Sequence, residues 1–496
     1  MYRIVLYELL FLVGAAVVLA VFGLLPYSPM SIILSATFIT VICWVINKIF
    51  AKIFEAPSNP ESTYITALIL ALIISPASGF ADMGFFILAF WASALAVASK
   101  YILAIGKKHV FNPAAIAVVI TAFALNQSAS WWVGTAAMLP FVLVGGLLIV
   151  RKVQRTDLVW GFTMAALITT LVLSAMHGSN VVSTAQKIIL SSPLIFFATI
   201  MLTEPLTSPP TIPLQMTYGI IVGILFAPAI HIGSIYSTPE LALVVGNIFS
   251  YIVSPKKKLV LKLKEVRQIS SDSYDFVFTP DKPLSFRPGQ YMEWTLGHDK
   301  SDSRGLRRYF TLASSPTEKE LRMGVKFYPD GSSFKKSLIS MQAGDKIVAT
   351  GLAGDFVLPK DKNEKLVFLA GGIGITPFRS MIQYLLDNGE KREVALLYSN
   401  KKISDVAYRE TFDLAEKNLG IKTVYAATSP EENISSSPNF VRRIDEKTIS
   451  EKVPDYRERI FYLSGPRGMV DAFDDTLRKM GVGKKQIKKD FFPGFV

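Results

Sequence analysis

A glycine-rich run in the second half of the chain, Gly371-Gly-Ile-Gly-Ile-Thr-Pro377, has the residue types that hold phosphate groups. It follows the short apolar run Leu366–Leu369 and opens a segment with helical spacing, Phe378–Leu386. Glycines at a turn from strand to helix let the backbone come close to a phosphate, and the N–H groups at the start of the helix favour negative charge. We therefore expect a pyridine nucleotide to bind at Gly371, Gly372, Gly374, Thr376 and Pro377.

A basic and aromatic motif, Arg308-Tyr-Phe-Thr-Leu-Ala-Ser-Ser-Pro316, precedes this run. It resembles the R-x-Y-[ST] signature of the ferredoxin–NADP reductase superfamily, with Phe310 in place of the tyrosine. The resemblance implies that Arg308 holds the pyrophosphate of FAD, because its guanidinium is a two-pronged donor, and that Phe310 stacks on the flavin ring. It also implies a catalytic place for Thr311, whose hydroxyl would approach the flavin N5. Tyr309 belongs to the same FAD-binding segment.

Further segments match the same superfamily, and the match extends from about Val260 to the C-terminus. The run Arg287, Pro288, Gly289 and Gln290 corresponds to R-P-G-Q-[YF]. The run Gly331, Ser332 and Ser333 corresponds to the second FAD segment, whose backbone N–H groups would meet the phosphates. The run Ser464, Gly465 and Pro466 stands at C-G-P-x-x-M, which implies a catalytic Ser464 beside the nicotinamide. Phe495 in the aromatic tail is implied to cover the flavin, also as a catalytic residue.

The choice between NAD and NADP stays open. Cationic and polar side chains follow the second α/β strand, and they suit a 2′-phosphate: Ser399, Lys401, Lys402 and Arg409. A solvated basic loop would have the same composition, because a cluster of point charges is not by itself a bidentate phosphate site.

The segments around these motifs predict two soluble domains. Residues 255–360 contain short strand-like runs with turn residues between them, which is typical of a small antiparallel barrel, here the FAD-binding one. Residues 361–496 alternate buried runs with helical ones, which indicates an α/β domain with a parallel sheet that binds NAD(P)H.

Residues 1–254 form a series of apolar stretches with few charges, which predicts a transmembrane α domain of about ten helices. Lys and Arg gather after the even-numbered stretches, for example at Lys107 and Lys108, whereas the odd-numbered loops are nearly free of them. This alternation places both termini and the C-terminal domains in the cytoplasm. We expect a multi-pass protein of the bacterial cytoplasmic (inner) membrane, surrounded by the lipid bilayer.

Composition excludes several classes of function. The net charge of +13 fits basic cytoplasmic loops, and no nucleic-acid-binding signature accompanies it, so we expect no nucleic-acid partner. The single cysteine, Cys43, can hold neither an iron–sulfur cluster nor a disulfide. Of the four histidines, His109, His177 and His231 fall at helix ends or loops, which argues against a di-haem conduit and indicates solvated loop residues. No metal site is expected. We therefore expect organic cofactors to carry out any redox chemistry.

Two polar, proline-containing segments interrupt the membrane half, Gly106–Ala115 and Met201–Pro210. Together with Thr66–Pro76 they resemble motifs of the NqrB/RnfD family, the flavin-carrying membrane subunits of sodium-pumping NADH:quinone reductase and the Rnf complex. The resemblance implies FMN or riboflavin among the helices, near Asn112, Pro113, Thr203 and Glu204. The family's covalent FMN site has no clean copy here. Thr135, in Val133–Ala137 on the predicted outer side, is the nearest candidate, and the alternative is a small residue at a helix contact.

Together the two halves predict a membrane-bound flavin oxidoreductase. Hydride would pass from NAD(P)H to FAD, and electrons would continue to a flavin in the membrane domain and then to quinone or an extracytoplasmic flavoprotein. A homo-oligomer or further membrane subunits are possible partners. The alternative is a transporter or ion pump with a regulatory or energising reductase domain. The sparse intramembrane charge argues against a coupled ion path, since the prominent acids, Asp82 and Glu204, both lie at predicted span edges. Loss of acceptor reduction without loss of NAD(P)H oxidation on deleting the spans would distinguish the two.

Overall fold

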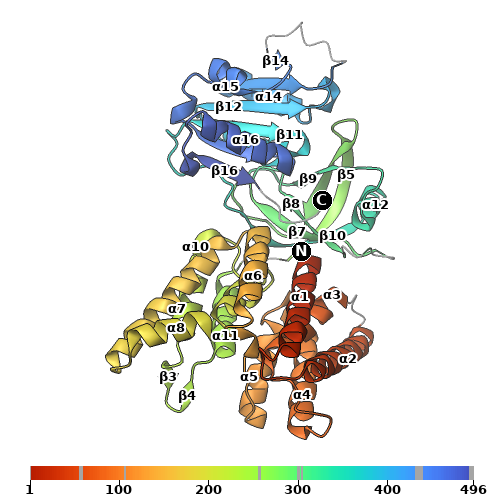
Figure 1. The fold of residues 1–496 in the computed structure, drawn as a ribbon. Coiled ribbons are helices and arrows are strands. Elements are labelled where there is room, and N and C mark those ends of the chain that lie inside the picture. Colours follow the sequence, from red (N-terminus) through yellow and green to blue (C-terminus); the bar gives the residue numbers. More distant parts are fainter. Residues whose placement is uncertain are drawn as a thin grey trace. The chain divides into compact units, whose positions relative to one another are not determined.

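The computed structural model describes residues 2–54, 60–105, 108–254, 258–298, 302, 305–430 and 439–490. The chain forms two compact units that divide between Ser254 and Pro255 (Figure 1). The first is helical, and the second contains two six-stranded sheets. The predicted flavin cover, Phe495, lies outside the described residues.

Apolar helices make up the first unit, and proline or a polar N-cap begins most of them. They are α1 (Tyr2–Val21), α2 (Pro29–Ile53), α3 (Pro60–Ile73), α4 (Met83–Ile102), α5 (Pro113–Leu125), α6 (Leu139–Val153), α7 (Thr156–Met176), α8 (Val181–Leu190), α9 (Leu194–Phe196), α10 (Ile212–Leu225) and α11 (Pro239–Val253). A 3-10 turn η1 (Trp132–Gly134), a π-helical turn η2 (Phe197–Met201) and the hairpins β1 (Ala104–Ile105) with β2 (Lys108–His109) and β3 (His231–Ile232) with β4 (Ile235–Tyr236) complete the unit.

Several of these helices are suited to a membrane. Among the described residues, four are long and apolar enough to cross one: Arg3–Val21, Pro29–Ile53, Met83–Ile102 and Thr156–Met176. The pair Val181–Leu190 and Leu194–Met201, bent by 54°, adds a fifth if it counts as one broken span. Large apolar side chains such as Trp160 and Met176 on α7 are exposed in the isolated chain. These features indicate membrane association, while the count of about ten spans stays a prediction.

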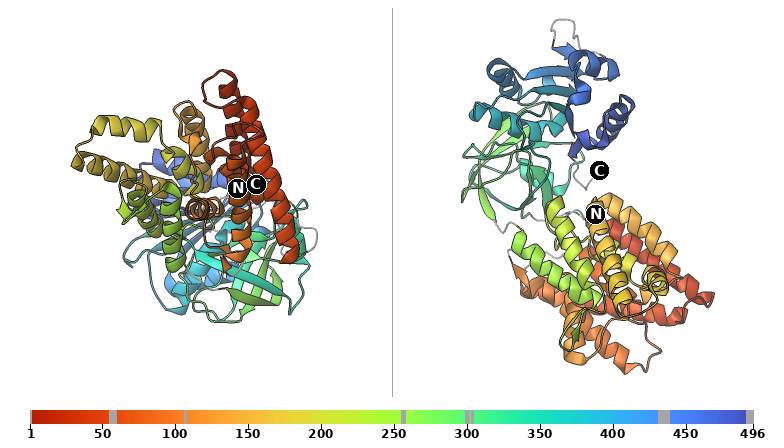
Figure 2. Two further views of the ribbon diagram at one scale, coloured as in Figure 1. Left: turned by 90° about the horizontal axis from the view of Figure 1, so that it is seen from below. Right: turned by 90° about the vertical axis from the view of Figure 1, so that its left-hand side faces the viewer.

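Glycines bring α7 and α10 into close contact. A Cβ at Gly219 would lie 2.7 Å from the Leu158 carbonyl oxygen, and one at Gly223 would lie 2.5 Å from that of Phe162. Small residues four positions apart let helix backbones approach, which is the usual way in which helices associate in lipid. Helix α7 also lies beside α8 (Figure 2). The Ser174 hydroxyl on α7 and the Thr184 hydroxyl on α8 lie 2.9 Å apart.

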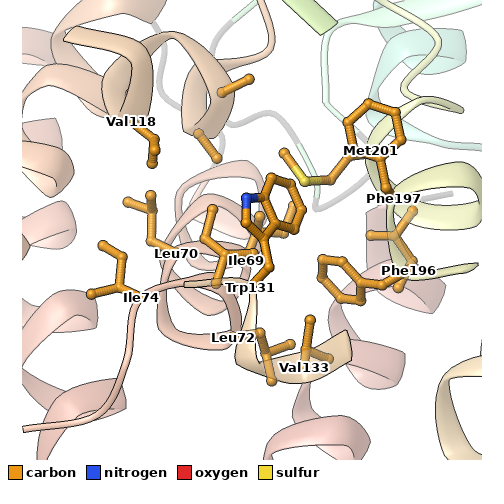
Figure 3. Packing of buried hydrophobic residues seen from close by; sticks show 14 of the residues in the cluster. Ile69, Leu70, Leu72, Ile74, Val118, Trp131, Val133, Phe196, Phe197 and Met201 are labelled. Atoms are coloured by element: carbon orange, nitrogen blue, oxygen red, sulfur yellow. The ribbon is translucent and has the colours of Figure 1, made fainter. Parts of the chain in front are cut away.

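The segment before α6 caps another helix instead of extending α6. The indole of Trp132 donates to the carbonyls of Ala71 and Ile74 at 3.0 Å, which satisfies the C-terminal end of α3. Trp131 packs beside Phe197 and the apolar face of α3 (Figure 3). The apolar run that contains Trp132 is therefore not one continuous helix, since α6 begins at Leu139.

The second unit begins with an antiparallel barrel. Its strands are β5 (Leu259–Gln268), β6 (Ser273–Pro280), β7 (Tyr291–Thr295), β8 (Arg307–Thr311), β9 (Leu321–Lys326) and β10 (Lys346–Ala353), in the order β8-β7-β10-β5-β6-β9, with α12 (Ser333–Ile339) between β9 and β10. Alternate side chains of β5, Leu259, Leu261 and Leu263, point into the core. The Ala313 N–H donates to the Arg322 carbonyl at 2.9 Å, which joins the two outermost strands.

The rest of the unit is an α/β domain with a parallel sheet. It contains β11 (Leu366–Gly371), η3 (Gly372–Ile375), α13 (Thr376–Asp387), β12 (Val394–Asn400), η4 (Ile403–Asp405), α14 (Arg409–Leu419), β13 (Lys422–Ala427), β14 (Phe440–Val441), α15 (Glu446–Lys452), η5 (Tyr456–Glu458), β15 (Ile460–Ser464), α16 (Arg467–Lys479), η6 (Lys484–Gln486) and β16 (Ile487–Asp490). The strand order is β14-β13-β12-β11-β15-β16. Alternate residues of β11 enter separate cores on the two faces, which explains its unbroken apolar run.

Candidate functional site

The glycine-rich run lies where the order of the parallel strands reverses, between β11 and β15. A Cβ at Gly371 would meet the Met469 sulfur at 2.3 Å, and one at Gly374 would meet the Ser464 carbonyl oxygen at 2.5 Å. Gly372 has a φ of 52° with open space at its Cβ position. The loop therefore packs tightly on its protein side and stays open on the other, as a phosphate cradle requires.

The helix that follows the cradle completes it. Thr376 and Pro377 are the first residues of α13, so proline occupies a position where its missing N–H costs nothing. The Tyr398 hydroxyl donates to the Gly372 carbonyl at 3.0 Å and holds the turn from β12. The start of this helix adds a partial positive charge beside the cradle. All five predicted nucleotide-binding positions of this run thus lie at one sheet edge.

The strand beside the cradle carries Ser464, which is buried at the end of β15, with Gly465 and Pro466 leading into α16. The Ser464 hydroxyl donates to the Asp490 carboxylate at 3.1 Å. Burial raises the pKa of the Asp490 carboxyl to about 7. Sequence reasoning missed Asp490, although it is the last acidic residue before the aromatic tail and so had a signal.

The barrel brings Arg308 to the second predicted FAD segment. The Ser333 N–H donates to the Asp302 carboxylate at 2.9 Å, and a terminal nitrogen of Arg308 lies 3.8 Å from that carboxylate. Gly331 turns the chain before α12, and Ser332 caps the helix by accepting from the Lys335 N–H. A carboxylate seated between a backbone N–H and a guanidinium marks a place that accepts an oxyanion. These residues fit the pyrophosphate of FAD.

The aromatic residues of the motif lie in different surroundings. Tyr309 is 39% exposed, and its hydroxyl donates to Glu293 at 2.8 Å. Phe310 is half-buried, with its ring centroid 5.9 Å from that of Phe334 in the barrel core. Thr311 is buried opposite Tyr291 of β7. Stacking of the flavin on Phe310 stays a prediction.

The Arg287–Gln290 segment forms a turn between the barrel and the α/β domain. Gly289 has a φ of 95°, and a Cβ there would meet the Phe356 carbonyl oxygen at 2.1 Å. Gln290 accepts from the Arg287 N–H at 2.8 Å, and the Arg287 guanidinium donates to the Leu358 carbonyl at 3.1 Å. The side chains of Arg287 and Gln290 thus stabilise the turn, within which Pro288 sits buried before Gly289. Their predicted contact with FAD stays a prediction.

The basic residues after β12 differ in how freely they could bind a 2′-phosphate. Arg409 lies over the rings of Tyr425 and Phe440 at 5.7 Å and pairs with Asp413 at 3.5 Å. Lys401 and Lys402 are exposed, and Ser399 is half-buried. If a 2′-phosphate binds here, the two lysines are the better placed cations, because Arg409 is already held by its neighbours.

The two polar segments of the membrane half come together around Glu204. His109 lies 3.0 Å and Asn112 2.9 Å from its two carboxylate oxygens, and Thr207 donates to it at 3.3 Å. The interpretation of His109 as a solvated loop residue is wrong, because its side chain is only 11% exposed and is bound to Glu204. We call Glu204, His109 and Asn112 the Glu204 cluster.

The surroundings of the Glu204 cluster include residues without a recognised motif. Asn247 of α11 accepts from the Asn112 N–H at 2.8 Å and donates to the Tyr218 hydroxyl at 3.1 Å. Pro113 begins α5, capped by Asn112. The Thr203 hydroxyl donates to the Thr199 carbonyl at 2.7 Å and so serves its own helix. Sequence reasoning missed Asn247 and Tyr218, which lie on apolar helices.

Thr135 lies in a small apolar pocket lined by Val133, Leu139, Val142, Leu190 and Phe196, among others. It has extended backbone geometry after η1, and so is not on a helix face. Its hydroxyl is buried and makes no hydrogen bond to any described residue. A buried hydroxyl without a hydrogen-bond partner is costly, and among the described residues Thr170 and Thr423 share this feature.

Comparison with known proteins finds matches in the second unit. The profile of the oxidoreductase FAD-binding domain matches residues 260–358, and that of the oxidoreductase NAD-binding domain matches residues 368–475. A flavohemoprotein of Pseudomonas putida is 30% identical over 235 residues, which cover 47% of this chain and 58% of that protein. The reductase subunit of an aromatic O-demethylase from an Amycolatopsis species is 27% identical over 247 residues, covering 49% and 71%.

A cytochrome P450 reductase of Amycolatopsis aligns with a TM-score of 0.42 and 27% identity, covering 48% of this chain and 70% of that one. The chain spans a little over half the length of the flavohemoproteins that it matches. The two matched domains lie in the same unit as the cradle, the Arg308 motif and Ser464. The C-terminal half of the chain is a ferredoxin–NADP reductase-like FAD/NAD-binding domain.

Proposed function

We propose that this protein is a membrane-bound NAD(P)H-dependent flavin oxidoreductase. Its electrons would pass from FAD to a flavin in the membrane half, and then to quinone or an extracytoplasmic flavoprotein. The observation that carries the first half of this proposal is the position of the cradle and Ser464 on adjacent strands of the domain matched by the NAD-binding profile, which follows the barrel matched by the FAD-binding profile. The apolar helices and the resemblance of their polar segments to flavin-carrying subunits support the second half.

The residues of the second unit have distinct roles in this function. Bound FAD would accept a hydride from NAD(P)H and release single electrons. Arg308 and the Ser333 N–H would hold its phosphates, and the Gly371–Thr376 loop with the start of α13 would hold those of the nucleotide. Ser464 would orient the nicotinamide through its hydroxyl, which donates a hydrogen bond to Asp490 and is held in place by it.

The first unit would hold FMN or riboflavin. The Glu204 cluster offers donors and acceptors in an otherwise apolar surrounding, which is how most ligand pockets fix orientation. The Thr135 hydroxyl, which makes no hydrogen bond to a described residue, is the candidate attachment atom for a covalent flavin. Irregular polar segments within a membrane domain usually line a cavity or are buried in protein, and the proposal takes the first of these for the Glu204 cluster.

The experiment that tests the proposal is a flavin inventory of the purified, detergent-solubilised protein. Acid extraction separates released from retained flavin, and in-gel fluorescence after denaturation reports covalent flavin. FMN or riboflavin beside FAD is the expected result. Fluorescence in the denatured wild-type band that disappears in Thr135→Val would assign the attachment atom. FAD alone would refute the membrane flavin, and the first unit would then be an anchor or a transporter.

A transporter or ion pump with an energising reductase domain is the second candidate. It is favoured by the carboxylates within the helical unit, Glu204 in its cluster and Glu240, which is 2% exposed and accepts from the Trp131 indole at 3.0 Å. Electron transfer to quinone that generates no ion gradient in proteoliposomes would count against it. An ion gradient without quinone reduction would count against the first candidate.

A further inference from the structure

A buried ion pair joins the FAD barrel to the nucleotide-binding helix. Arg379 lies one turn into α13, three residues after Thr376 of the cradle. Its guanidinium pairs with both carboxylate oxygens of Glu318, one of them at 3.0 Å, and Glu318 belongs to the loop between β8 and β9. Arg379 is 5% exposed. The pair therefore connects two domains whose cofactors must meet.

Side chains of the same helix also donate hydrogen bonds to the backbone that follows the flavin motif. A terminal nitrogen of Arg379 donates to the Ala313 carbonyl at 3.0 Å, and the Ser380 hydroxyl donates to the Ser314 carbonyl at 2.6 Å. Ala313 and Ser314 come two and three residues after Thr311, which the superfamily resemblance places at the flavin N5. The start of the cradle helix is thus tied to the end of the flavin strand by two side chains.

A second layer of charges supports this pair. Arg322 of β9 binds Glu318 at 3.2 Å and Asp275 at 2.8 Å, and the Tyr408 hydroxyl donates to Asp275 at 2.9 Å. Burial, and then the Asp275 carboxylate, raise the pKa of Tyr408 well above its usual value, so the hydroxyl stays a neutral donor.

Tyr408 also has a constrained backbone. Its φ of 59° is rare for a bulky residue. A Cβ at Gly324 would lie 2.7 Å from the Tyr408 hydroxyl oxygen and 2.7 Å from a Thr376 methyl, so β9 packs directly on the first turn of α13. Strain of this kind persists where the surrounding structure determines it, and it gathers at functional sites.

We propose that Arg379 and Glu318 are positioning residues for hydride transfer, which set the distance between the nicotinamide and the flavin by fixing the cradle helix against the flavin strand. The inference rests on the proposed NAD(P)H:FAD reaction. Transfer requires the reacting atoms to approach within about 3–3.5 Å, and a misplacement of about 1 Å can cost roughly 100-fold in rate. An Arg–carboxylate fork fixes orientation as well as distance, whereas lysine offers only a point charge.

The test compares Arg379→Lys with Arg392→Lys in the full-length protein. Arg392 is 5% exposed in its side chain and pairs with Glu390 at 2.6 Å, and its contacts stay within the α/β domain and the segment leading into it. We expect Arg379→Lys to slow flavin reduction at saturating NAD(P)H by about 10- to 100-fold, with FAD content and nucleotide KM within about threefold of wild type. The nicotinamide–flavin charge-transfer absorbance should weaken, and Arg392→Lys should change neither readout.

Ser380→Ala is the milder second variant, because it removes one hydrogen bond and leaves the ion pair. It should give a smaller loss in the same direction with a thermal midpoint close to that of wild type. Equal flavin reduction rates in Arg379→Lys, Ser380→Ala and wild type would overturn the inference, as would equal losses in Arg379→Lys and Arg392→Lys. A wild-type protein that binds FAD but is not reduced by NAD(P)H would instead refute the proposed reaction, and the inference with it.

Discussion

Ser464 and Asp490 lie opposite each other at the ends of the neighbouring parallel strands β15 and β16, joined by a hydrogen bond of 3.1 Å. This pair stands next to the nucleotide cradle, because β15 is also the neighbour of β11. If the proposed hydride transfer takes place beside this pair, the raised pKa of the Asp490 carboxyl, about 7, would make the reaction depend on pH near neutrality.

The pH dependence of flavin reduction follows from this pair. The Asp490 pKa is raised to about 7, so the carboxyl is neutral below that pH and ionised above it. In the proposed reaction the ionised form, which accepts from Ser464, would stabilise the positive charge that develops on the nicotinamide as hydride leaves. The rate should therefore rise with pH through an apparent pKa near 7. Stopped-flow reduction of Asp490→Asn should lose this inflection, and an unchanged profile would contradict the assignment.

Stability should respond to the same carboxyl. Its folded-state pKa lies above the unfolded value of about 3.9, so the native state binds more protons between about pH 4 and pH 7 and stability falls as pH rises through that window. Asp490→Asn should remove this component. Thermal unfolding of the wild-type protein and the variant at about pH 5 and pH 8 measures this pH-dependent part of the stability. The variant should gain the most stability over wild type at the higher pH. Identical pH responses would contradict the raised pKa.

FAD retention should depend on Arg308. Arg308→Ala should weaken FAD binding by about 10- to 100-fold, because a hydrogen bond to a charged group contributes about 1.5–3 kcal/mol. Flavin content and titration of the apoprotein measure the change. Arg307→Ala is the matched control, since Arg307 is on the same strand, 37% exposed in its side chain and 3.5 Å from Glu293. Equal losses in the two variants would indicate a general effect on β8.

Electron delivery to the membrane acceptor should depend on the Glu204 cluster. Glu204→Gln keeps the shape of the side chain but removes the charge that His109 and Asn112 contact. Quinone reduction should fall at least about tenfold, the scale of a lost charged hydrogen bond. Ferricyanide reduction, which needs only the second unit, should stay unchanged. Glu240→Gln serves as the control for loss of a buried charge elsewhere in the unit. If Glu204→Gln lowered quinone reduction and ferricyanide reduction equally, the result would argue against a membrane relay.

The contact between α7 and α10 should be sensitive to a single methyl group. Gly223→Ala places a Cβ about 2.5 Å from the Phe162 carbonyl oxygen, so the helices must separate, at a cost of about 1–3 kcal/mol. Gly14→Ala is the control, because nothing lies within 4 Å of its Cβ position in α1 and alanine is the better helix former. Thermal unfolding in detergent should show a lower midpoint for Gly223→Ala alone.

Local sequence determined much of the second unit. The cradle glycines, the Arg308 motif and the Ser464 turn could be recognised because each depends on a few consecutive residues with a fixed backbone requirement. Helix starts such as Pro113 after Asn112 were recognisable for the same reason. The apolar runs indicated the helical unit, since the length and hydropathy of a stretch are properties of the stretch itself.

Contacts between distant residues could not be read in this way. Glu204 meets Asn112 across 92 positions, Arg379 meets Glu318 across 61, and the Trp132 indole meets the end of α3 across about 60. No local pattern distinguishes a tryptophan that caps another helix from one that begins its own, or a loop histidine from one bound to a carboxylate. The sequence by itself determined which elements and which cofactor motifs this protein has. Only the tertiary structure decided which polar side chains meet, because a buried donor or acceptor takes whatever partner the packing of the elements brings within hydrogen-bond distance.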